Sequence, residues 1–377
     1  FVFYRVYMMN KSLISSIVLG SLLIGTTAAG AAEQEENVVH VYNWNESIDM
    51  SVIPVFEKQT GIKVIYDLFD SNEVLDTKML TGQSGYDVVF PGSEFVTHQV
   101  KAGVYQELTM ENIPNLKNMD PAQMELLKGI DTSGSLHAIP YLSGTTGIAY
   151  NVDKVAKVLG PDFKIDSWDV FFKPEILSKL TPCGVAVLNA PTEIIGTAMH
   201  YLGLDPNATD PKAYKPAEEL LKTMAPHVTY FHSSQNINDL ANGDICITIG
   251  WSGDMMQAKA RAEEAKNGVK INYIVPKEGA LIFYDTMAVP RDAPNKANAY
   301  KFINYILEAK TMGQISSYTA YGNAVKPSIE FVDPQVKNNP HIFIPDEMMP
   351  KMFMVYGKPP KVMREINKMW TRIKVAK

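Results

Sequence analysis

The residues from 38 to 92 read VVHVYNWNESIDMSVIPVFEKQTGIKVIYDLFDSNEVLDTKMLTGQSGYDVVFPG. Three runs in this stretch are rich in apolar and β-branched residues and predict strands, at residues 38–42, 62–69 and 87–90. Between the first two runs, apolar residues recur at helical spacing and stop at Thr60-Gly61. A second helix, for which Ser71 is a suitable N-cap, fits between the other two. The order strand, helix, strand, helix, strand predicts a parallel sheet covered by helices.

The same alternation resumes beyond Gly144-Thr145-Thr146-Gly147 and predicts a second α/β lobe. Its expected strands are residues 148–150, 185–188 and 245–249, with a helix at residues 192–202. Further along the chain, strands are expected at residues 271–276 and 283–289 and a helix at residues 295–308. Because no repeat, low-complexity tract or Pro-rich linker separates the lobes, short crossing strands that can act as a hinge should join them. We assign residues 37–144 and about 286–318 to the first lobe, and about 147–282 and 322–377 to the second.

The first 31 residues have the pattern of a cleavable secretory signal peptide. Lys11 precedes an apolar run from Leu13 to Ile24, and small residues follow that include the cleavage site Ala29-Gly30-Ala31. The run is too short to span a bilayer, and no later segment approaches the roughly 18 apolar residues of a membrane helix. We therefore expect a periplasmic mature chain that starts near Ala32, with no membrane insertion. Because no cysteine lies at the cleavage site, we expect no lipid anchor.

The charge of the chain bears on its partners. The formal net charge is −6, and removal of residues 1–31 takes away Arg5 and Lys11, which leaves 33 basic against 41 acidic residues and a net charge of −8. A surface of this charge repels nucleic acid, so no nucleic-acid partner is expected. The charge is compatible with a cationic ligand, although ordinary solubility explains it equally well.

The sequence contains two cysteines, Cys183 and Cys246. In an oxidising compartment they are expected to pair, and closure of a loop of about 60 residues would stabilise the fold by roughly 4 kcal/mol. The alternative roles are a thiol nucleophile or a metal ligand. The absence of a C-x-x-C motif and of histidines at ligand spacing disfavours both.

Aromatic and acidic residues gather where the predicted strands end. Four such groups follow strands: residues 42–46, residues 92–94, Glu193, and residues 251–254. In open parallel sheets, ligands bind beyond the carboxyl ends of the strands. We therefore expect these residues to meet in one cleft.

The residue types in this cleft suit a ligand with two protonated amines. Carboxylates form charge-assisted hydrogen bonds with an ammonium group, and a cation over an aromatic ring gains roughly 0.5 to 2 kcal/mol. A diamine needs an acidic group at each end and aromatic walls along its methylene chain. The candidate walls are Trp44, Trp251, Phe283 and Tyr321, and the candidate acids are Glu46, Glu193, Asp254 and Asp285. Each has a simpler explanation, as core, as solvated charge or as a complement to a helix dipole, so the prediction rests on their joint placement.

Longer motifs sharpen the prediction. They are Phe-Asp-Ser-Asn-Glu-Val-Leu at residues 69–75, residues 149–154, residues 230–246 with His232-Ser233-Ser234-Gln235, and Gly-Trp-Ser-Gly-Asp at residues 250–254. With these motifs the chain resembles the putrescine-binding receptors of bacterial polyamine ABC transporters, within the wider periplasmic spermidine/putrescine receptor family, from about Val38 to the C-terminus. The resemblance implies a monomeric, two-lobed solute-binding fold of type II. It also implies a polyamine, first of all putrescine, in a cleft between the lobes, and an inner-membrane ABC permease as partner.

The resemblance also implies roles for individual residues. Its ligand contacts fall on Trp44, Asn45, Glu193, Trp251, Asp254, Phe283, Asp285 and Tyr321, and its disulfide falls on Cys183 and Cys246. Trp44 and Asp285 would come from the first lobe, and Glu193, Trp251 and Asp254 from the second. Closure of the lobes around the ligand would expose the surface that the permease recognises.

Two segments depart from the family pattern. This chain has Asn45-Glu46-Ser47 where relatives have Ser/Thr-Asp-Tyr, and Gly92-Ser93-Glu94-Phe95 where relatives have Ser-x-Ser-Phe. One aromatic wall is lost, and the second change is expected to add volume and a negative charge. We therefore include Glu46, Ser93 and Glu94 among the expected contacts, and keep spermidine, cadaverine and agmatine as alternative ligands.

Other classes of function fit the sequence less well. A serine hydrolase would use Ser252, but a G-x-S-x-G elbow needs glycine at position 254, where this chain has aspartate. A metal site is disfavoured because the seven histidines are scattered, and Tyr318 with Tyr321 is the only faint tyrosine pair. A sugar site would favour planar polar side chains, and an amino-acid site would need an arginine beside these motifs. We expect no enzymatic activity, no cofactor and no metal.

Overall fold

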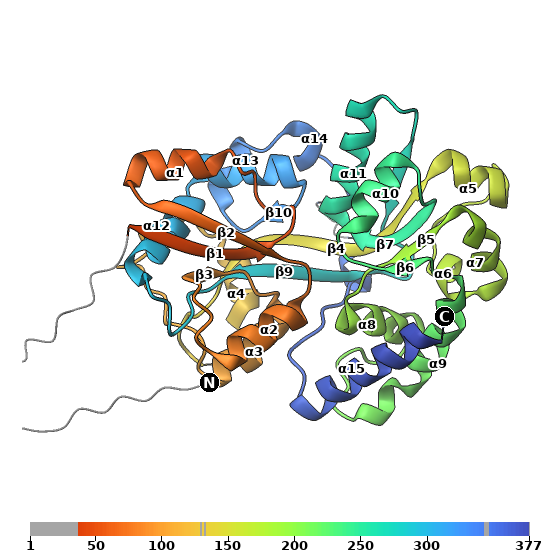
Figure 1. Ribbon diagram of the computed structural model, residues 1–377, viewed down its shortest axis with the longest axis horizontal. Coiled ribbons are helices and arrows are strands. Elements are labelled where there is room, and N and C mark those ends of the chain that lie inside the picture. The colour runs from red at the N-terminus through yellow and green to blue at the C-terminus, as the bar shows by residue number, and fades with distance from the viewer. Residues whose placement is uncertain (1–36, 129, 132, 343–346, 377) are drawn as a thin grey trace, which may run out of the picture. The chain divides into compact units, whose positions relative to one another are not determined.

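The computed structural model describes residues 37–128, 130–131, 133–342 and 347–376. The expected signal peptide lies outside these residues. Among the residues that are described, no helix is both long enough and apolar enough to cross a membrane. The described chain forms two α/β lobes connected by two strands (Figure 1).

The first sheet contains three parallel strands in the order β2-β1-β3. Their bounds are β1 Val38–Trp44, β2 Lys63–Phe69 and β3 Val88–Val89. The helices α1 (Val52–Thr60) and α2 (Asn72–Thr81) lie between them in the chain. The order predicted from residues 38–92 is therefore confirmed.

Local chemistry fixes the ends of these two helices. Gly61 has a φ of 71°, a conformation that glycine adopts without strain, and its N–H bonds to Glu57 O at the end of α1. Ser71 caps α2 by accepting a hydrogen bond of 3.2 Å from the N–H of Glu73. Of the apolar residues of α2, Leu75 is buried, whereas Val74 and Leu80 are each 49% exposed. The apolar stripe of α2 is thus narrower than its sequence suggests.

The second sheet is mixed. Its main path is β10-β4-β7-β5-β6, and β8 and β9 also pair with β4. The bounds are β4 Ile139–Asn151, β5 Val185–Val187, β6 Tyr230–Phe231, β7 Ile247–Trp251, β8 Ile271–Ile274, β9 Leu281–Met287 and β10 Gly322–Asn323. β5 pairs in parallel with β6 and β7, whereas β4 pairs antiparallel with all of its neighbours.

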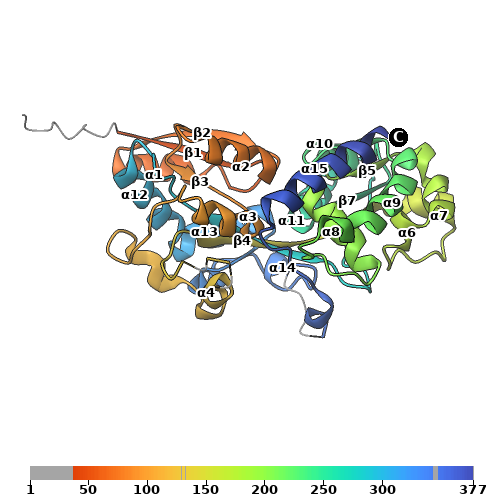
Figure 2. The same cartoon turned by 90° about the horizontal axis from the view of Figure 1, so that it is seen from below.

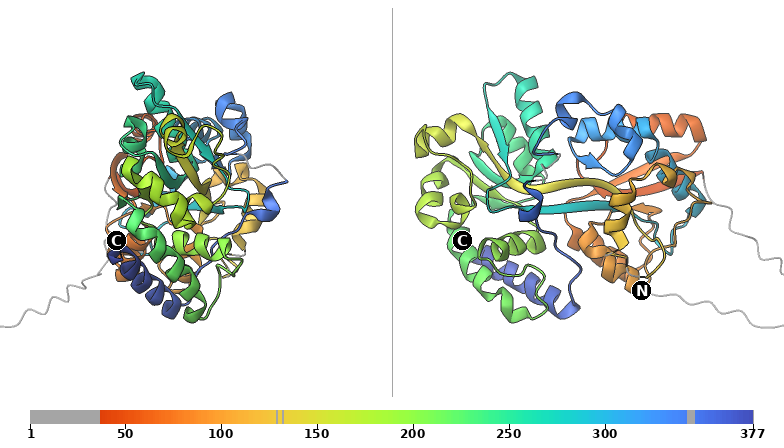
Figure 3. Two further views of the ribbon diagram at one scale, coloured as in Figure 1. Left: turned by 90° about the vertical axis from the view of Figure 1, so that its right-hand side faces the viewer. Right: turned by 180° about the vertical axis from the view of Figure 1, so that it is seen from behind.

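The strands β4 and β9 pair with each other and run from one lobe to the other (Figure 3). β4 continues through Gly144-Thr145-Thr146-Gly147, which the sequence pattern places before a strand rather than inside one. These glycines serve close packing: a Cβ at Gly144 would lie 2.7 Å from the Tyr321 ring, and one at Gly147 would lie 2.5 Å from Tyr273 Oη. The lobes are therefore joined by continuous strands.

Helices cover both sheets (Figure 2). The first lobe carries α1, α2, α3 (Ser93–Lys101), α4 (Pro121–Lys128), α12 (Lys296–Ile306) and α13 (Ala309–Thr319). The second carries α5 (Val152–Leu159), α6 (Asp169–Phe172), α7 (Pro174–Leu180), α8 (Pro191–Tyr201), α9 (Lys215–Met224), α10 (Gln235–Asn242), α11 (Ser252–Ala265) and α15 (Pro360–Val375). The short elements are α14 (Pro334–Lys337) and the 3-10 helices η1 (Pro114–Asn118), η2 (Thr181–Cys183), η3 (Pro211–Tyr214), η4 (Ala225–His227), η5 (Lys326–Glu330) and η6 (Met349–Lys351). α8 and α12 confirm the helices expected at residues 192–202 and 295–308.

Buried apolar side chains form two large clusters that follow the two lobes. The first cluster draws on residues 39–142 and 287–325, and the second on residues 148–249, Ala280 and residues 362–373. Ala324 and Val325 pack in the first cluster, although the sequence assignment places residues 322–377 in the second lobe. The second cluster includes the apolar face of α15, a helix that was not anticipated from the sequence.

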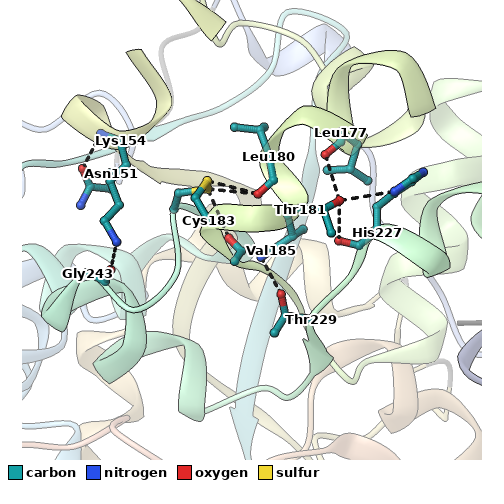
Figure 4. Close-up of a disulfide and its surroundings, with 12 residues drawn as sticks. Asn151, Lys154, Leu177, Leu180, Thr181, Cys183, Val185, His227, Thr229 and Gly243 are labelled. Carbon is teal, nitrogen blue, oxygen red and sulfur yellow. Dashed lines mark hydrogen bonds between the residues drawn. A yellow bond between two sulfur atoms is a disulfide. The ribbon is translucent and has the colours of Figure 1, made fainter. Parts of the chain in front are cut away.

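Cys183 and Cys246 form the expected disulfide, with their Cα atoms 5.5 Å apart (Figure 4). Cys183 ends η2 and Cys246 directly precedes β7, so the bridge ties the turn after α7 to the sheet of the second lobe. Cys246 is fully buried. The bond is therefore part of the core of this lobe and lies away from the strand ends on which the expected contacts stand.

We predict that replacement of both cysteines by serine lowers the free energy of unfolding by about 4 kcal/mol. The reason is that the unfolded chain regains the freedom of a loop that the bridge closes over a sequence separation of 63 residues. Urea unfolding of the oxidised protein and of the Cys183→Ser/Cys246→Ser variant measures the difference. Equal unfolding midpoints would contradict a stabilising role for the bridge.

Candidate ligand-binding cleft

One cavity, with about 370 Å³ of empty space that includes open solvent, collects most of the residues expected to bind a ligand. Its lining residues are Trp44, Asn45, Ser47, Asn72, Glu94, Glu193, Trp251, Asp254, Phe283, Asp285 and Tyr321. They come from the end of β1, the starts of α2, α3, α8 and α11, the end of β7, the strand β9 and the turn after α13. The carboxyl ends of strands in both lobes thus meet at this cavity, as expected for sheets of this kind.

Four aromatic rings form a row along the cavity. Trp44 and Trp251 have ring centroids 5.6 Å apart, Trp251 and Phe283 6.4 Å, and Phe283 and Tyr321 6.0 Å. Every pair is arranged edge to face, with interplanar angles between 66° and 75°. Interlocked rings of this kind form a rigid apolar wall.

Two carboxylates are hydrogen-bonded to rings of this row. Glu193 Oε2 accepts hydrogen bonds from Nε1 of Trp251, the second ring, at 2.9 Å and from Thr146 Oγ1 at 2.8 Å. The hydroxyl of Tyr321, the last ring, donates to Asp254 Oδ1 at 2.9 Å. The aromatic residues therefore orient the acids as well as forming the wall.

Burial makes these two carboxylates unusually basic. Glu193 is 7% exposed, and desolvation raises its pKa to about 7 against the bonds from Trp251 and Thr146. Asp254 is 4% exposed, and desolvation likewise raises its pKa to about 7. Both groups would be ionised more fully in the presence of a nearby cation.

Two further carboxylates add negative charge to the cavity. Burial raises the pKa of Asp285 well above its ordinary value, and the charges of Glu193 and Asp254 raise it further. Burial and the charge of Glu193 also raise the pKa of Glu94 well above its ordinary value. The buried indole N–H of Trp44 lies near enough to Asp285 to favour its ionised form, but it completes no hydrogen bond with any described residue. It is a donor available to a ligand or to Asp285.

Glu94 occupies the space that Gly92 leaves open. A Cβ at position 92 would lie 2.7 Å from Glu94 Oε2 and 2.4 Å from Asn72 Nδ2. Asn72 Nδ2 donates to Glu94 Oε1 at 2.6 Å, and Asn72 Oδ1 accepts from the N–H of Gly92 at 2.9 Å. The extra volume expected from the Gly92 substitution is therefore filled by the carboxylate, and the change brings charge rather than space.

Two expected contacts do not line the cavity. Glu46 adopts a left-handed backbone, with φ of 59°, and its Oε2 lies 2.7 Å from Arg261 Nη2 on α11. It joins the loop after β1 to the other lobe. Ser93 is 2% exposed at the start of α3 and is absent from the lining residues.

Asn72 and Ser47 line the cavity but were not among the expected contacts. Asn72 follows Ser71 at the start of α2, immediately beyond the end of β2. The rule that located Glu94 and Glu193, proximity to the carboxyl end of a strand, also applies to this position. Ser47 lies in the segment that departs from the family pattern, and no signal in the sequence marked it.

The geometry does not suit the alternative chemistries. Ser252 is fully buried, and its Oγ accepts a hydrogen bond from the N–H of Thr145 at 3.2 Å, so it is not an exposed nucleophile. Among the described residues, no cluster of three or more histidine, cysteine or acidic side chains is arranged to hold a metal ion. Tyr318 is 49% exposed and Tyr321 only 3%. Within the described part of the chain, no lysine, arginine or histidine lines the cavity, so the arrangement suits a cation with an apolar middle.

We predict that the protein without ligand loses stability as the pH rises from 5 to 8. The pKa values near 7 of Glu193 and Asp254 mean that the folded state holds protons that the unfolded chain has already released. Their contribution is complete below the unfolded pKa and is lost as the pH rises through about 7. Thermal unfolding across this range measures the effect, which Glu193→Gln/Asp254→Asn should reduce. An unchanged pH profile in the double variant would show that other groups are responsible.

Comparison with known proteins identifies the family of this chain. A family model described as bacterial extracellular solute-binding protein matches residues 52–344. The putrescine-binding periplasmic protein PotF of Escherichia coli K12 is 46% identical over 370 residues, which cover 98% of this chain and 99% of that protein. The putrescine-binding periplasmic protein SpuD of Pseudomonas aeruginosa is 46% identical over 360 residues, covering 96% and 98%.

Solved structures confirm the two-lobed α/β fold. The spermidine/putrescine ABC transporter substrate-binding protein PotD from Streptococcus pneumoniae superposes with a TM-score of 0.69 at 25% identity, covering 90% of this chain and 99% of that one. The TpPotD lipoprotein of Treponema pallidum, at 21% identity, has a TM-score of 0.74 over 90% of this chain and 99% of its own, and supports the fold alone. PotF, SpuD and the Streptococcus pneumoniae PotD are named as binding proteins rather than enzymes. The chain belongs to the family of bacterial extracellular solute-binding proteins.

Proposed function

We propose that this protein is a periplasmic receptor for a polyamine, with putrescine as the first candidate, and that it delivers its ligand to an ABC permease in the inner membrane. The observation that carries the proposal is the row of four aromatic rings in which Trp251 is hydrogen-bonded to Glu193 and Tyr321, two rings further along, to Asp254. The printed names of its relatives PotF and SpuD, both putrescine-binding periplasmic proteins, support the same ligand class.

In this proposal, the two ammonium groups of the ligand bind at the two acidic ends, and its methylene chain lies against the aromatic rings. Each ammonium exchanges its hydration for charge-assisted hydrogen bonds, and the apolar chain leaves water. Asp285 and Glu94 supply further negative charge in the same cavity. The protein makes and breaks no covalent bond.

Contacts divided between the lobes provide a mechanism for closure. Beside the cavity, Thr192 Oγ1 of α8 donates to Glu73 Oε1 of α2 at 3.2 Å, and Arg261 pairs with Glu46. These contacts form only when the lobes meet. A ligand that bridges Trp44 and Glu193 binds the closed form better than the open form, and so shifts the equilibrium toward closure.

The direct test is calorimetric titration of the mature protein, starting at Ala32, with putrescine, cadaverine, spermidine, spermine and agmatine. Arginine and maltose serve as controls. The protein should first be unfolded and refolded to remove any ligand carried through purification. Binding of at least one polyamine at micromolar affinity or better, without binding of the controls, is the expected result. No binding by any amine would overturn the proposed function and leave only the fold.

One observation favours a longer or guanidinium-bearing amine as a second candidate. A smaller pocket, with about 210 Å³ of empty space that includes open solvent, adjoins the cavity and shares Trp44, Asn72, Glu94, Glu193 and Trp251 with it. Its further lining residues are Asp70, Ser71, Glu73, Phe95, Ala190 and Thr192. Burial raises the pKa of Glu73, which would face the same pocket as Glu94. A third cationic group in this pocket would therefore lie close to the carboxylates of Glu73 and Glu94.

We predict that Asp254→Ala weakens binding of the preferred amine by roughly 2 to 4 kcal/mol, because one ammonium loses a charged and desolvated partner. Calorimetry measures the change. Asp162→Ala, which removes an exposed carboxylate outside the cavity, is the matched control and should leave the affinity unchanged. Unchanged affinity in Asp254→Ala would refute the assignment of this end of the site.

We predict that Glu94→Gln weakens binding of spermidine more than binding of putrescine. The substitution keeps the size of the side chain, and hence its fit beside Gly92, but removes the charge that would face a third amine. The ratio of the two affinities, measured in the wild type and in the variant, isolates this effect. Glu111→Gln is the control for the loss of an exposed carboxylate. An equal loss for both amines would place Glu94 in the part of the site that every ligand uses.

A further inference from the structure

A groove on the second lobe gathers five basic side chains. They are Lys212 of η3, Lys215 of α9, and Lys361, Arg364 and Lys368 of α15. The groove holds about 970 Å³ of space open to solvent, and Pro211 and Met369 contribute apolar surface to it. We call this surface the basic groove. It shares no lining residue with the ligand cavity.

The acidic residues of the basic groove already have hydrogen-bond or ion-pair partners within the protein. Arg372 donates to Glu218 at 2.6 and 3.0 Å and to Glu365 at 2.8 Å. Lys222 Nζ lies 2.9 Å from Glu218 Oε1. Asp210 Oδ1 accepts the N–H of Lys212 at 3.0 Å as a helix cap.

A local excess of positive charge results. The five cations of the groove, Arg372 and Lys222 make seven positive groups against the four carboxylates of Asp210, Glu218, Glu219 and Glu365, which leaves three positive charges. The whole chain carries a formal net charge of −6, so this surface is opposite in sign to the rest of the molecule. Within the described residues, none of the five groove cations has a carboxylate within 4.0 Å.

The cations are held in two facing rows. Lys361, Arg364 and Lys368 follow the i, i+3, i+7 spacing of one helical face, while Val362 and Ile366 of the same helix are buried in the core. Lys212 and Lys215 form the opposite row at the start of α9. α15 lies beside α8 and α9 in two views (Figures 1 and 2), and the Arg372–Glu218 pair clamps α15 to α9. The two rows of cations are therefore held in place relative to each other in the absence of a bound partner.

We propose that the basic groove is the docking site for an acidic, extended segment of a partner protein. Seven residues of α15 rise about 10 Å, which an extended segment covers with about three residues. Successive side chains of such a segment point to opposite sides, so alternate carboxylates can reach both rows of cations. Because these cations line a groove, their arrangement favours a narrow extended segment over a flat anionic membrane. A receptor that hands its ligand to a transporter must dock on it, and this inference rests on the proposed function only in placing the acidic segment on that transporter.

The test uses the full mature protein and a fluorescently labelled ten-residue peptide of alternating glutamate and glycine. A peptide with glutamine in place of glutamate is the probe control. The groove variant is Lys361→Glu/Arg364→Glu/Lys368→Glu. The matched variant, Lys157→Glu/Lys164→Glu/Lys179→Glu, makes the same charge change at exposed lysines elsewhere on the second lobe.

At low salt, the groove variant should bind the acidic peptide at least about tenfold more weakly than the wild type, and the matched variant no more than about threefold more weakly. Lys212→Ala/Lys215→Ala should also weaken binding, which tests the second row without charge reversal. Equal losses in the groove and matched variants would overturn the proposal, because the attraction would then be one of net charge. Preference for vesicles that contain phosphatidylglycerol over the peptide would overturn it in favour of a membrane surface.

Polyamine titration of the same variants separates this proposal from the proposed function. Both triple variants should bind the amine like the wild type, which also shows that they are folded. Uptake through the cognate transporter should then fail with the groove variant and persist with the matched variant. Normal uptake with the groove variant would overturn the docking role. If the wild type binds no amine, the proposed function fails while the peptide result stands by itself.

Discussion

Glu94, Glu193, Asp254 and Asp285 bury their carboxylates along one cavity, and this concentration of negative charge governs the cleft. Burial raises the pKa of all four, and repulsion from neighbouring carboxylates adds to it. No basic side chain of the described chain lines the cavity to offset the charge. Closure of the lobes around an empty cavity is therefore opposed by the desolvation of these carboxylates and by the repulsion between them. A ligand with a cationic group near Glu193 and another near Asp254 offsets both effects. The same charges thus give selectivity for amines and a reason for the lobes to close on them.

Much of the fold could be predicted because it rests on local signals. The β-branched runs around β1 and β2, the cap at Ser71 and the stop at Gly61 act within a few residues, and each is visible in the sequence. The site was largely predictable for a related reason. Strand ends in parallel sheets converge, so Trp44, Glu193 and Asp254 could be grouped without knowledge of distances.

The remaining features depend on contacts between distant parts of the chain. Glu46 has the chemistry of a ligand contact, and only the position of Arg261 across the cleft shows that it is already paired. Glu94 and Gly92 look like independent changes in the sequence, yet the carboxylate of one fills the space beside the other. Gly144 to Gly147 resemble an interruption, but they lie within β4, where close rings leave no room for side chains. In each case the role of the residue depends on tertiary packing, which the hydrophobic periodicity of the sequence does not reveal.

The central claim is that a cation replaces protons in the cavity, and the number of protons released on binding tests it most directly. Calorimetric titration with putrescine at pH 7, in two buffers of different ionisation enthalpy, gives that number. Because the pKa values of Glu193 and Asp254 lie near 7 without a ligand and should fall beside an ammonium group, the account predicts a net release of protons. Binding with no proton release, or with proton uptake, would contradict it.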